Sequence, residues 1–353
     1  RPRAGHCGAR HRCPPSAPPC LQHLAGVRPG GLGDAAAAEH AGDLLDPFLA
    51  PERVHPADQA GRPVGATLLL GHLEVVVRAA RHLRQVGDAE HLAVRGEALH
   101  QLADHRGHGA TRAPDAPPGH FAARDGIEKV LADVDAVHGH VARIHPGLPL
   151  LIFGHSMGGI VALNAVMRRS EHLAGAAIWN ANVSARAMAR LALSILGWER
   201  FRRGADTPSR LLPRLTFQAW GRAIAGGRTS FDWLSRDPTE VQAYTSDPLC
   251  GWHPSVSMWQ DIFRMILDAS DEHGLASVRR TLPFHLTGGA ADPSTDNGAA
   301  VEALAARMRR MGFSNLQSRI WPQNRHEGLN DLDREAVTAD FVEWAKRVVI
   351  AHR

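Results

Sequence analysis

Four short segments rich in apolar residues alternate with amphipathic stretches in the C-terminal two-thirds of the chain. The runs are "LPLLIFG" (148–154), "LAGAAIWNANV" (173–183), "LPFHLTGG" (282–289) and "LQSRIWP" (316–322). Such runs are typical of strands that are buried on both faces of a parallel sheet. Helical patterns follow three of them, at 157–170, 297–312 and 333–349. This alternation predicts an α/β protein with a mainly parallel sheet flanked by helices.

The alternation stops between residues 183 and 270. Three helical stretches follow one another there, at 185–201, 208–224 and 255–270. Loops marked by Pro and Gly join them. Helices inserted between two strands of one sheet are typical of a cap. We therefore expect a core made of residues 104–182 and 271–353, with residues 183–270 forming a helical cap or lid.

The first 103 residues differ in composition from the rest of the chain. They contain one aromatic residue, Phe48, and no Ile, Lys, Met, Asn, Tyr or Trp, whereas the other 18 aromatic residues all follow. Such a segment lacks the side chains that build a packed core. Three interpretations are open: a disordered extension, a folded but weakly patterned segment, or a stretch outside the natural reading frame. We favour the third, because the boundary is abrupt and an initiator Met is absent; a single frame across codons 90–110 would contradict it.

Charge and hydropathy argue against several classes of function. The net charge is +4 on 353 residues and no run of five like charges occurs, so we expect no nucleic-acid partner. No apolar run approaches the ~20 residues that span a bilayer, and the first residues lack the apolar segment of a signal peptide. We expect a cytoplasmic protein, at most peripheral to a membrane.

The four cysteines form neither a disulfide framework nor a standard metal site. Cys7, Cys13 and Cys20 crowd the first twenty residues, and Cys250 lies far away. Their spacing, even with nearby histidines, matches no common zinc motif. We expect no metal and no cofactor.

The segment "FGHSMGG" (153–159) places Ser156 between an apolar strand and a helix. A sharp strand–turn–helix elbow holds a serine in a strained conformation and requires small neighbours, which Gly154 and Gly158 supply. The helix N-terminus that follows favours a developing oxyanion, with the backbone N–H of Met157 as one donor. The alternative is a glycine-rich turn with an incidental serine. The strand before and the helix after it favour a nucleophile.

A serine nucleophile requires a histidine base and a carboxylate that orients it. With this elbow the acid and then the histidine follow the serine in chain order. Asp292 lies just after the third apolar run and His326 just after the fourth. Asp296 competes for the acid role, but it lies beside the next helix and is expected to cap it. Asp292 could instead be a turn residue before Pro293, and His326 a surface-loop residue.

Seven motifs together resemble the lysophospholipase and monoacylglycerol lipase-like branch of the α/β-hydrolases, over about residues 104–350. They are "DHRGHG" (104–109), "GHFAARDG" (119–126), "FGHSMGG" (153–159), "FDWLSRDP" (231–238), "DPLCGW" (247–252), "GGAADPSTDNGAAVEAL" (288–304) and "RHEGLND" (325–331). The resemblance implies an α/β-hydrolase fold with a lid over an acyl-binding cleft. It also implies that Ser156 is the nucleophile, Asp292 the acid and His326 the base of a serine hydrolase. The implied substrate is a carboxylic ester of a single-chain lipid.

The sequence departs from this family upstream of "DHRGHG". Family members have a His-Gly dipeptide there, at the end of the third strand, and the loop after it supplies one backbone N–H of the oxyanion hole. Here Gly71-His72 is in reversed order and no glycine-rich loop follows. The second donor is therefore unknown. Loss of one donor costs ~100–1000-fold in rate, which leaves a catalytically impaired chain as an alternative.

The cap carries the argument about substrate. Met188, Leu191, Ile195 and Trp198 fall at helical spacing and would suit the lining of an acyl-chain cleft. Equally, these residues could pack the cap onto the core. A peptidase of the proline-iminopeptidase type and a general carboxylesterase are the rival enzymes, although the cap offers no clear acidic pair for a substrate amine. A transient contact of the cap with a membrane surface is a further expectation.

Overall fold

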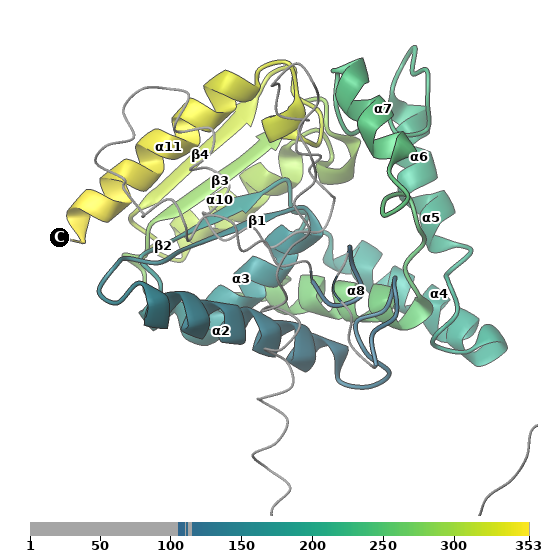
Figure 1. The fold of residues 1–353 in the computed structure, drawn as a ribbon, viewed down its shortest axis with the longest axis horizontal. Helices are drawn as coiled ribbons and strands as arrows, with labels where there is room; N and C mark the ends of the chain where they lie inside the picture. The colour runs from purple at the N-terminus through teal and green to yellow at the C-terminus, as the bar shows by residue number, and fades with distance from the viewer. Residues whose placement is uncertain (1–104, 110, 112–114, 353) are drawn as a thin grey trace, which may run out of the picture. The chain divides into compact units, whose positions relative to one another are not determined.

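The computed structural model describes residues 105–109, 111 and 115–352, and four parallel strands form the centre of that part of the chain (Figure 1). They are β1 (Leu151–His155), β2 (Gly175–Trp179), β3 (Phe284–Gly289) and β4 (Leu316–Trp321), in the spatial order β1-β2-β3-β4. The four predicted strands and their parallel pairing are confirmed. The predicted features of residues 1–103, including Gly71-His72, lie outside the described residues.

Both faces of β1, β2 and β3 are buried, which explains their apolar character. Strand β4 was also expected to be buried, but it is only partly buried and its Arg319 is exposed, because it is the last strand of the described sheet. In β1, Ile152 belongs to a core cluster on one face, whereas Leu151 and Phe153 belong to a second cluster on the other. Alternate residues of a strand point to opposite faces, so a strand covered on both sides must be apolar throughout.

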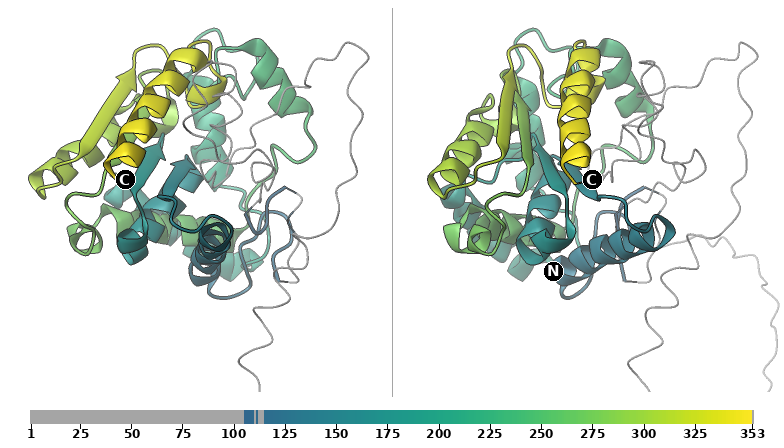
Figure 2. Two further views of the ribbon diagram at one scale, coloured as in Figure 1. Left: turned by 60° about the vertical axis from the view of Figure 1, so that its left-hand side comes forward. Right: turned by 90° about the vertical axis from the view of Figure 1, so that its left-hand side faces the viewer.

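Helices cover the two faces unequally (Figures 1 and 2). Helix α11 (Arg334–Ala351) covers one face, where Phe341 and Trp344 pack against the strands. The opposite face is covered by α2 (Gly126–Ile144), α3 (Met157–Arg169), α8 (Val256–Ser270) and α10 (Ala299–Arg310). The predicted helices at 157–170, 297–312 and 333–349 correspond to α3, α10 and α11. Helix α2 was not predicted, although Val130, Leu131 and Val134 give it a buried stripe.

The segment between β2 and β3 is helical, as expected. It contains α4 (Arg186–Arg203), α5 (Leu212–Leu215), α6 (Phe217–Ala223), α7 (Pro238–Ser246), α8 and α9 (Glu272–Ala276). The helical stretch expected at 208–224 consists of two short helices, α5 and α6. The helix breaks at Thr216, whose backbone leaves the helical region with φ −117° and ψ −97°.

Helix α8 links the inserted helices to the core. It packs against α4 on one side and against α2 and α3 on the other. Its N-terminus is capped by Ser255, whose hydroxyl accepts a hydrogen bond from Met258 N–H, and Met258 and Met265 are fully buried. The boundaries of cap and core at residues 183 and 270 stay a prediction. Three short 3-10 turns complete the described elements: η5 (Ser170–His172), η6 (Pro293–Thr295) and η7 (Gly328–Asn330).

Candidate active site

The carboxyl ends of the strands bring the predicted site residues to one edge of the sheet. Ser156 directly follows β1, Asp292 follows β3 and His326 follows β4. Because parallel neighbours end at the same edge, residues far apart in the chain meet there. Two residues near this edge that the sequence had not singled out also take part: Asn180 after β2, which is buried, and Ser294 after Asp292, which is partly buried.

The turn at Ser156 has the strained geometry of a nucleophile elbow. Its backbone adopts φ 55° and ψ −122°, a region that residues other than glycine rarely occupy. The Ser156 N–H donates to Trp179 O at 2.9 Å, and the Ser156 carbonyl accepts from Gly159 N–H at 3.0 Å. Strand β2 and helix α3 therefore hold the elbow from both sides.

Two glycines are needed because backbone atoms approach the elbow closely. A Cβ on Gly154 would lie 2.2 Å from Gly158 O, and a Cβ on Gly159 would lie 2.8 Å from the Ala181 Cβ. Neither contact can be relieved by rotating a flexible side chain, because the obstructing atoms are backbone or Cβ. The requirement for a glycine at Gly154 is confirmed, and Gly159 is an additional glycine of the same kind.

Met157 is the first residue of α3. Its N–H lies at the end of the helix where backbone donors have no intrahelical partner. This position matches the role in the oxyanion hole that the sequence suggested, and that role stays a prediction. The second donor, sought near Gly71-His72, lies outside the described residues.

Asp292 and His326 form a buried pair. His326 Nδ1 lies 2.9 Å from Asp292 Oδ2, and the two side chains are 1% and 0% exposed. The sequence left two alternatives to this pairing: Asp292 as a turn residue and His326 as a residue of a surface loop. Asp292 does cap the 3-10 turn by accepting from Ser294 N–H, so its turn role and its pairing with His326 coexist. A surface position for His326 is wrong.

The hydrogen bonds around the pair determine which imidazole nitrogen carries the proton. The Ser294 hydroxyl donates to Asp292 Oδ1 at 2.7 Å, and the Ser294 Oγ also lies 2.8 Å from His326 Nδ1. With its own proton engaged, Ser294 can only accept from Nδ1, as can the carboxylate. Nδ1 is therefore protonated, which leaves Nε2 as the basic nitrogen.

The carboxylate of Asp292 is held in its ionised form. Burial alone would raise its pKa, but the neighbouring charge of His326 and hydrogen bonds from His326, Asn180 and Ser294 outweigh burial and lower the pKa to about 2. Asn180 Nδ2 donates to Oδ2 at 2.9 Å, and the Thr295 hydroxyl donates to the same oxygen at 3.0 Å. The oxygens of Asp292 are thus satisfied within the protein.

Burial and the carboxylate act in opposite directions on His326. Burial disfavours the charged imidazolium, but the charge of Asp292 and its hydrogen bond prevail, so the pKa of His326 is raised above its ordinary value of 6.5. His326 Nε2 is buried and has no hydrogen-bond partner among the residues that the structure describes. No hydrogen bond joins it to Ser156 Oγ in this part of the chain. A buried, unpaired basic nitrogen is costly unless a ligand or a reacting group engages it.

His155 connects the elbow to the loop that carries His326. Its Nε2–H donates to the backbone carbonyl of His326 at 2.8 Å, and the two rings lie 4.7 Å apart. Burial, followed by the charge of His326, lowers the pKa of His155 to about 3, so its ring is neutral. The residue immediately before Ser156 therefore contacts His326 directly.

The prediction that Asp296 caps the next helix is wrong. Gly298 occupies the N-cap position of α10, and Asp296 has a left-handed backbone with φ 53°. Asp296 ends the 3-10 turn η6 instead. The loop between β3 and α10 contains the 3-10 turn η6, which Asp292 caps, before α10 begins at Ala299.

The four apolar cap residues lie on α4. Met188, Leu191 and Trp198 are 62%, 54% and 57% exposed, whereas Ile195 is partly buried and packs against the core. Their role in binding substrate stays a prediction. In the described part of the chain, no three His, Cys, Asp or Glu side chains are grouped so that they could hold a metal ion.

Residues 78–333 match the family described as serine aminopeptidase, S33. The chain belongs to this family. The match includes all three predicted triad residues and both flanks of the cap, and it begins within the segment of atypical composition.

Two curated relatives and one solved structure illustrate what this S33 family member is similar to. Monoglyceride lipase of Rattus norvegicus is 27% identical over 222 residues, which cover 63% of this chain and 65% of the relative. This chain thus spans slightly less than two-thirds of the rat protein. Monoacylglycerol lipase of Mycolicibacterium smegmatis is 25% identical over 282 residues, covering 76% of this chain and 87% of the relative.

A thermostable carboxyl esterase of Bacillus coagulans has a similar structure. It superposes with a TM-score of 0.66 at 20% sequence identity, covering 79% of this chain and 88% of the esterase. At that level of identity the likeness concerns the fold. It confirms the expected α/β-hydrolase fold of this S33 family member.

Proposed function

We propose that this protein is a serine hydrolase that cleaves carboxylic esters of single-chain lipids. The observation that carries the proposal is the buried Asp292–His326 pair, whose free Nε2 belongs to a histidine that is tethered to the elbow of Ser156. Activation of a serine requires this combination of base, orienting carboxylate and strained nucleophile.

In the first half of the reaction, Ser156 Oγ attacks the ester carbonyl carbon. His326 Nε2 takes the hydroxyl proton as the Oγ–C bond forms, and Asp292 stabilises the resulting imidazolium through Nδ1–H. The carbonyl oxygen becomes an oxyanion, which accepts from the Met157 N–H at the start of α3. Its collapse breaks the bond to the alcohol, which takes the proton from Nε2 and leaves an acyl-Ser156.

In the second half, water repeats the same sequence. His326 Nε2 removes a proton from water, whose oxygen attacks the acyl carbon, and the imidazolium then returns the proton to Ser156 Oγ. The products are a free carboxylic acid and the regenerated hydroxyl. The raised pKa of His326 supports both directions of proton transfer, because the imidazolium must persist until the leaving group departs.

The names of the relatives support a glyceride ester of one acyl chain as substrate. The rat and mycobacterial relatives are named as lipases of monoglycerides or monoacylglycerols. We propose a substrate of this class, with a lysophospholipid as the alternative single-chain lipid. The less specific alternative is a general carboxylesterase, which requires no acyl-chain cleft.

The aminopeptidase activity in the family description is the second candidate function. An aminopeptidase needs acidic side chains that bind the substrate's ammonium group. Three buried acids lie between β2 and β3, and each is already engaged. Glu199 accepts from Ser209 Oγ and Arg210 N–H, Asp232 accepts from Arg228 N–H, and Asp261 accepts from Arg264 Nη1. Because these carboxylates already accept hydrogen bonds within the protein, we favour an ester substrate over one with an ammonium group.

One experiment separates these activities. The full chain is treated with a fluorophosphonate probe and assayed against monoacylglycerols, lysophosphatidylcholine, a short-chain ester and an aminoacyl amide, with Ser156→Ala as the matched control. We expect labelling and monoacylglycerol cleavage that Ser156→Ala abolishes. Cleavage of the amide alone would make the chain a peptidase, and cleavage of the short ester alone a carboxylesterase. Absence of Ser156-dependent labelling would identify a catalytically impaired chain.

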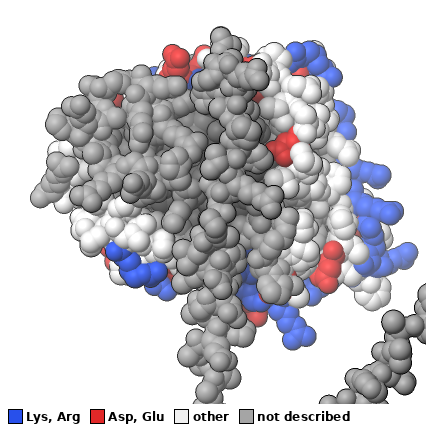
Figure 3. Space-filling model, in the orientation of Figure 1, with Lys and Arg blue, Asp and Glu red and all other residues white. Residues whose placement is uncertain are grey.

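We also propose that α4 contacts a lipid surface. Besides Met188, Leu191 and Trp198, its Phe201 is 87% exposed. Five arginines lie on the same helix, and its single acid, Glu199, is buried. Figure 3 shows Lys and Arg side chains along the edge where α4 lies in Figure 1. Exposed apolar residues with flanking arginines are typical of helices that lie in a membrane interface.

No described helix is long and apolar enough to cross a membrane, so this contact would be peripheral. Sedimentation with anionic vesicles tests it, using Phe201→Glu and the control Ile350→Glu, which alters an exposed residue on α11. We expect only Phe201→Glu to reduce binding; equal binding by both variants would contradict a contact through α4. A cytoplasmic location stays a prediction.

A further inference from the structure

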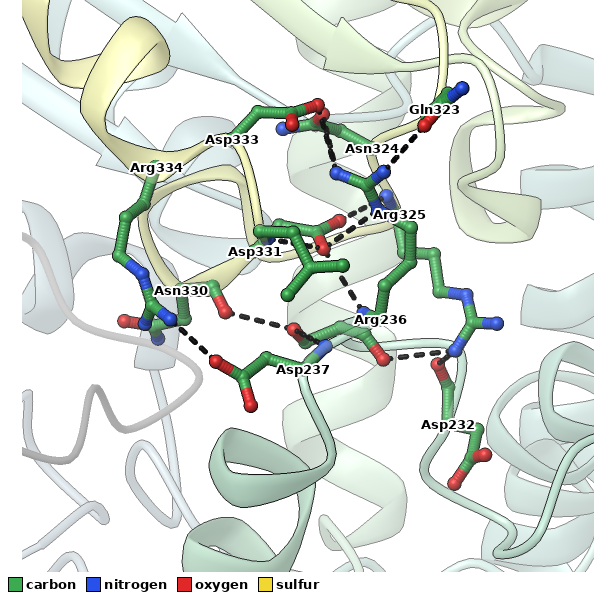
Figure 4. A network of polar contacts seen from close by, with 12 residues as sticks. Asp232, Arg236, Asp237, Gln323, Asn324, Arg325, Asn330, Asp331, Asp333 and Arg334 are labelled. Carbon is green, nitrogen blue, oxygen red and sulfur yellow. Dashed lines mark hydrogen bonds and ion pairs between the residues drawn. The ribbon is translucent and has the colours of Figure 1, made fainter.

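A loop of the inserted region lies directly against the loop that carries His326. We call residues 231–238, which form the last part of the connection from α6 and the first residue of α7, the docking segment. We call residues 322–333, which join β4 to α11, the histidine loop. Both contain motifs of the family resemblance, "FDWLSRDP" and "RHEGLND", of which only His326 takes part in the proposed reaction. Figure 4 shows the polar side chains with which they meet.

Backbone hydrogen bonds attach the two segments at the catalytic histidine itself. Glu327 N–H donates to Leu234 O at 2.7 Å, and His326 N–H donates to Trp233 O at 3.3 Å. The Trp233 ring lies 4.9 Å from the His326 ring. The main chain on either side of the imidazole is therefore held by a segment some ninety positions earlier in the sequence.

A buried ion pair fixes this attachment. Arg236 donates to Asp331 Oδ1 through its Nε at 2.9 Å and through its backbone N–H at 3.1 Å. The other oxygen of Asp331 accepts from Arg325 N–H at 2.8 Å. Arg325 immediately precedes His326, so one carboxylate connects the docking segment to the peptide next to the histidine.

Arg236 also spans the whole histidine loop. Its Nη1 donates to Gln323 Oε1 at 2.9 Å, near the end of β4, and its Nη2 donates to Asp333 Oδ2 at 2.8 Å, at the start of α11. Arg325 reaches back across the contact, donating to the carbonyls of Asp232 and Ser235. The fork of a guanidinium can join several acceptors at fixed angles, which an ammonium cannot do.

The burial of this pair indicates that it fixes the conformation of the histidine loop more than it stabilises the fold. Asp331 is 0% exposed and the Arg236 side chain 17% exposed. A buried ion pair adds little net stability compared with apolar residues of similar size, because desolvation offsets the attraction. Its directional hydrogen bonds, in contrast, hold a loop in one conformation. The loop held in this way carries the only proton acceptor that the proposed reaction uses.

We propose that Arg236 and Asp331 are positioning residues for His326: their ion pair holds the histidine loop so that the imidazole stays within reach of Ser156. The proposal rests on the proposed hydrolase function. It makes catalysis depend on contact between the docking segment and the core, since release of the segment would free both peptides flanking His326.

The test compares two arginines that both tie the inserted region to the C-terminal part of the chain. Arg236→Gln and Arg236→Lys alter the positioning pair. The matched control is Arg334→Gln, because the Arg334 side chain bonds to Asp237 and Glu240 at the start of α7 and supports none of the backbone around His326. Asp331→Asn completes the set, since it keeps the shape of the side chain and removes its charge.

Two readouts are measured on the full-length protein. The first is fluorophosphonate labelling of Ser156 together with kcat and KM on a monoacylglycerol. The second is the NMR resonance of the His326 Nδ1 proton and its titration in protein labelled with [15N]histidine. Thermal unfolding confirms that each variant is folded.

We expect Arg236→Gln to slow labelling and lower kcat by roughly 10–100-fold, the scale on which a small displacement of a catalytic group acts, with KM changed less than about threefold. Arg236→Lys should recover part of the loss. The Nδ1 resonance should broaden and the His326 pKa should fall toward 6.5, because the bond to Asp292 loosens. Arg334→Gln should change rate and titration by less than about threefold.

Two results would overturn the proposal. One is a wild-type rate and a wild-type His326 titration in folded Arg236→Gln; if that variant does not fold, Arg236→Lys and Asp331→Asn are judged by the same measure. The other is an equal loss in Arg334→Gln, which would assign the effect to general docking of the inserted region. Failure of the hydrolase function is separate: wild-type protein would then not label, while the NMR comparison would still decide whether Arg236 positions His326.

Discussion

In the proposed reaction the elbow at Ser156 and the histidine loop have complementary roles, yet they are held by different means. The elbow is held between regular elements: β1 enters it, α3 leaves it, β2 accepts its N–H, and Gly154 removes the clash between β1 and α3. The histidine loop has no regular element between Trp321 and Gly328. Its conformation comes from contacts with His155, with the docking segment and with Asp292.

This difference shows where each half of the site is vulnerable. Changes near Ser156 should alter folding, because the strained backbone depends on a tightly packed turn. Changes around His326 should alter rate and pH dependence while the fold persists, because they act on the placement and protonation of one side chain. The following predictions test that division, beginning with the largest expected effect.

Asp292→Asn should lower kcat about 10⁴-fold, the loss seen when a triad carboxylate becomes an amide. The Asn amide would donate toward Nδ1, so the proton would move to Nε2 and the base would be lost. Steady-state hydrolysis of a monoacylglycerol, corrected by active-site labelling, measures this. Activity within tenfold of the wild type would show that Asp292 does not orient His326.

Gly154→Ala should destabilise the fold by about 3 kcal/mol or more, since its Cβ would overlap backbone atoms that cannot move aside. Urea unfolding followed by circular dichroism measures the change in the free energy of unfolding. Gly197→Ala is the matched control: it lies within α4, nothing lies within 4 Å of its added Cβ, and it should raise stability by about 1 kcal/mol. Equal effects of the two substitutions would contradict a special requirement at the elbow.

Activity should rise with pH through the pKa of His326, which lies above 6.5. Below that pKa, kcat/KM should fall roughly tenfold for each pH unit, because only the neutral imidazole accepts the proton of Ser156. Stability should follow the opposite course: a raised pKa stabilises the fold fully below pH 6.5, and this contribution is lost as the pH rises through the folded pKa. Paired pH profiles of kcat/KM and of thermal unfolding measure both. A midpoint of activity below 6.5 would contradict the raised pKa.

His155→Phe should reduce kcat about 3–10-fold, the equivalent of one lost hydrogen bond. The substitution keeps a ring beside His326 and removes the N–H that binds its carbonyl. His155→Gln, which retains a donor, should restore most of the rate. If His155→Phe were as active as His155→Gln, this hydrogen bond would not support the histidine loop.

Much of the fold could be predicted from the sequence because burial on both faces leaves a clear apolar signal. The four strands, and helices α3, α8, α10 and α11, were all legible as runs or stripes. Helix α2 was missed, since its apolar stripe covers only part of its length, and the break at Thr216 was missed because no Gly or Pro marks it. Boundaries set by local backbone geometry leave little trace in a hydropathy pattern.

The candidate site was predictable for the residues whose chemistry is distinctive. Ser156 stands in a recognisable pentad, and Asp292 and His326 stand where chain order expects them. Asn180 and Ser294, which satisfy the carboxylate, were missed, because an amide after a strand and a serine in a turn are common. Only their convergence on Asp292 distinguishes them.

The sequence by itself determined the order of the strands along the chain, the elbow and the identity of the residues at each strand end. These features depend on hydrophobic periodicity and on glycine at fixed spacing, both of which act over a few residues. Tertiary structure alone decided which nitrogen of His326 is basic, that Arg236 and Asp331 support its loop, and that Asp296 caps no helix. Those outcomes depend on contacts between residues far apart in the chain, for which no local pattern exists.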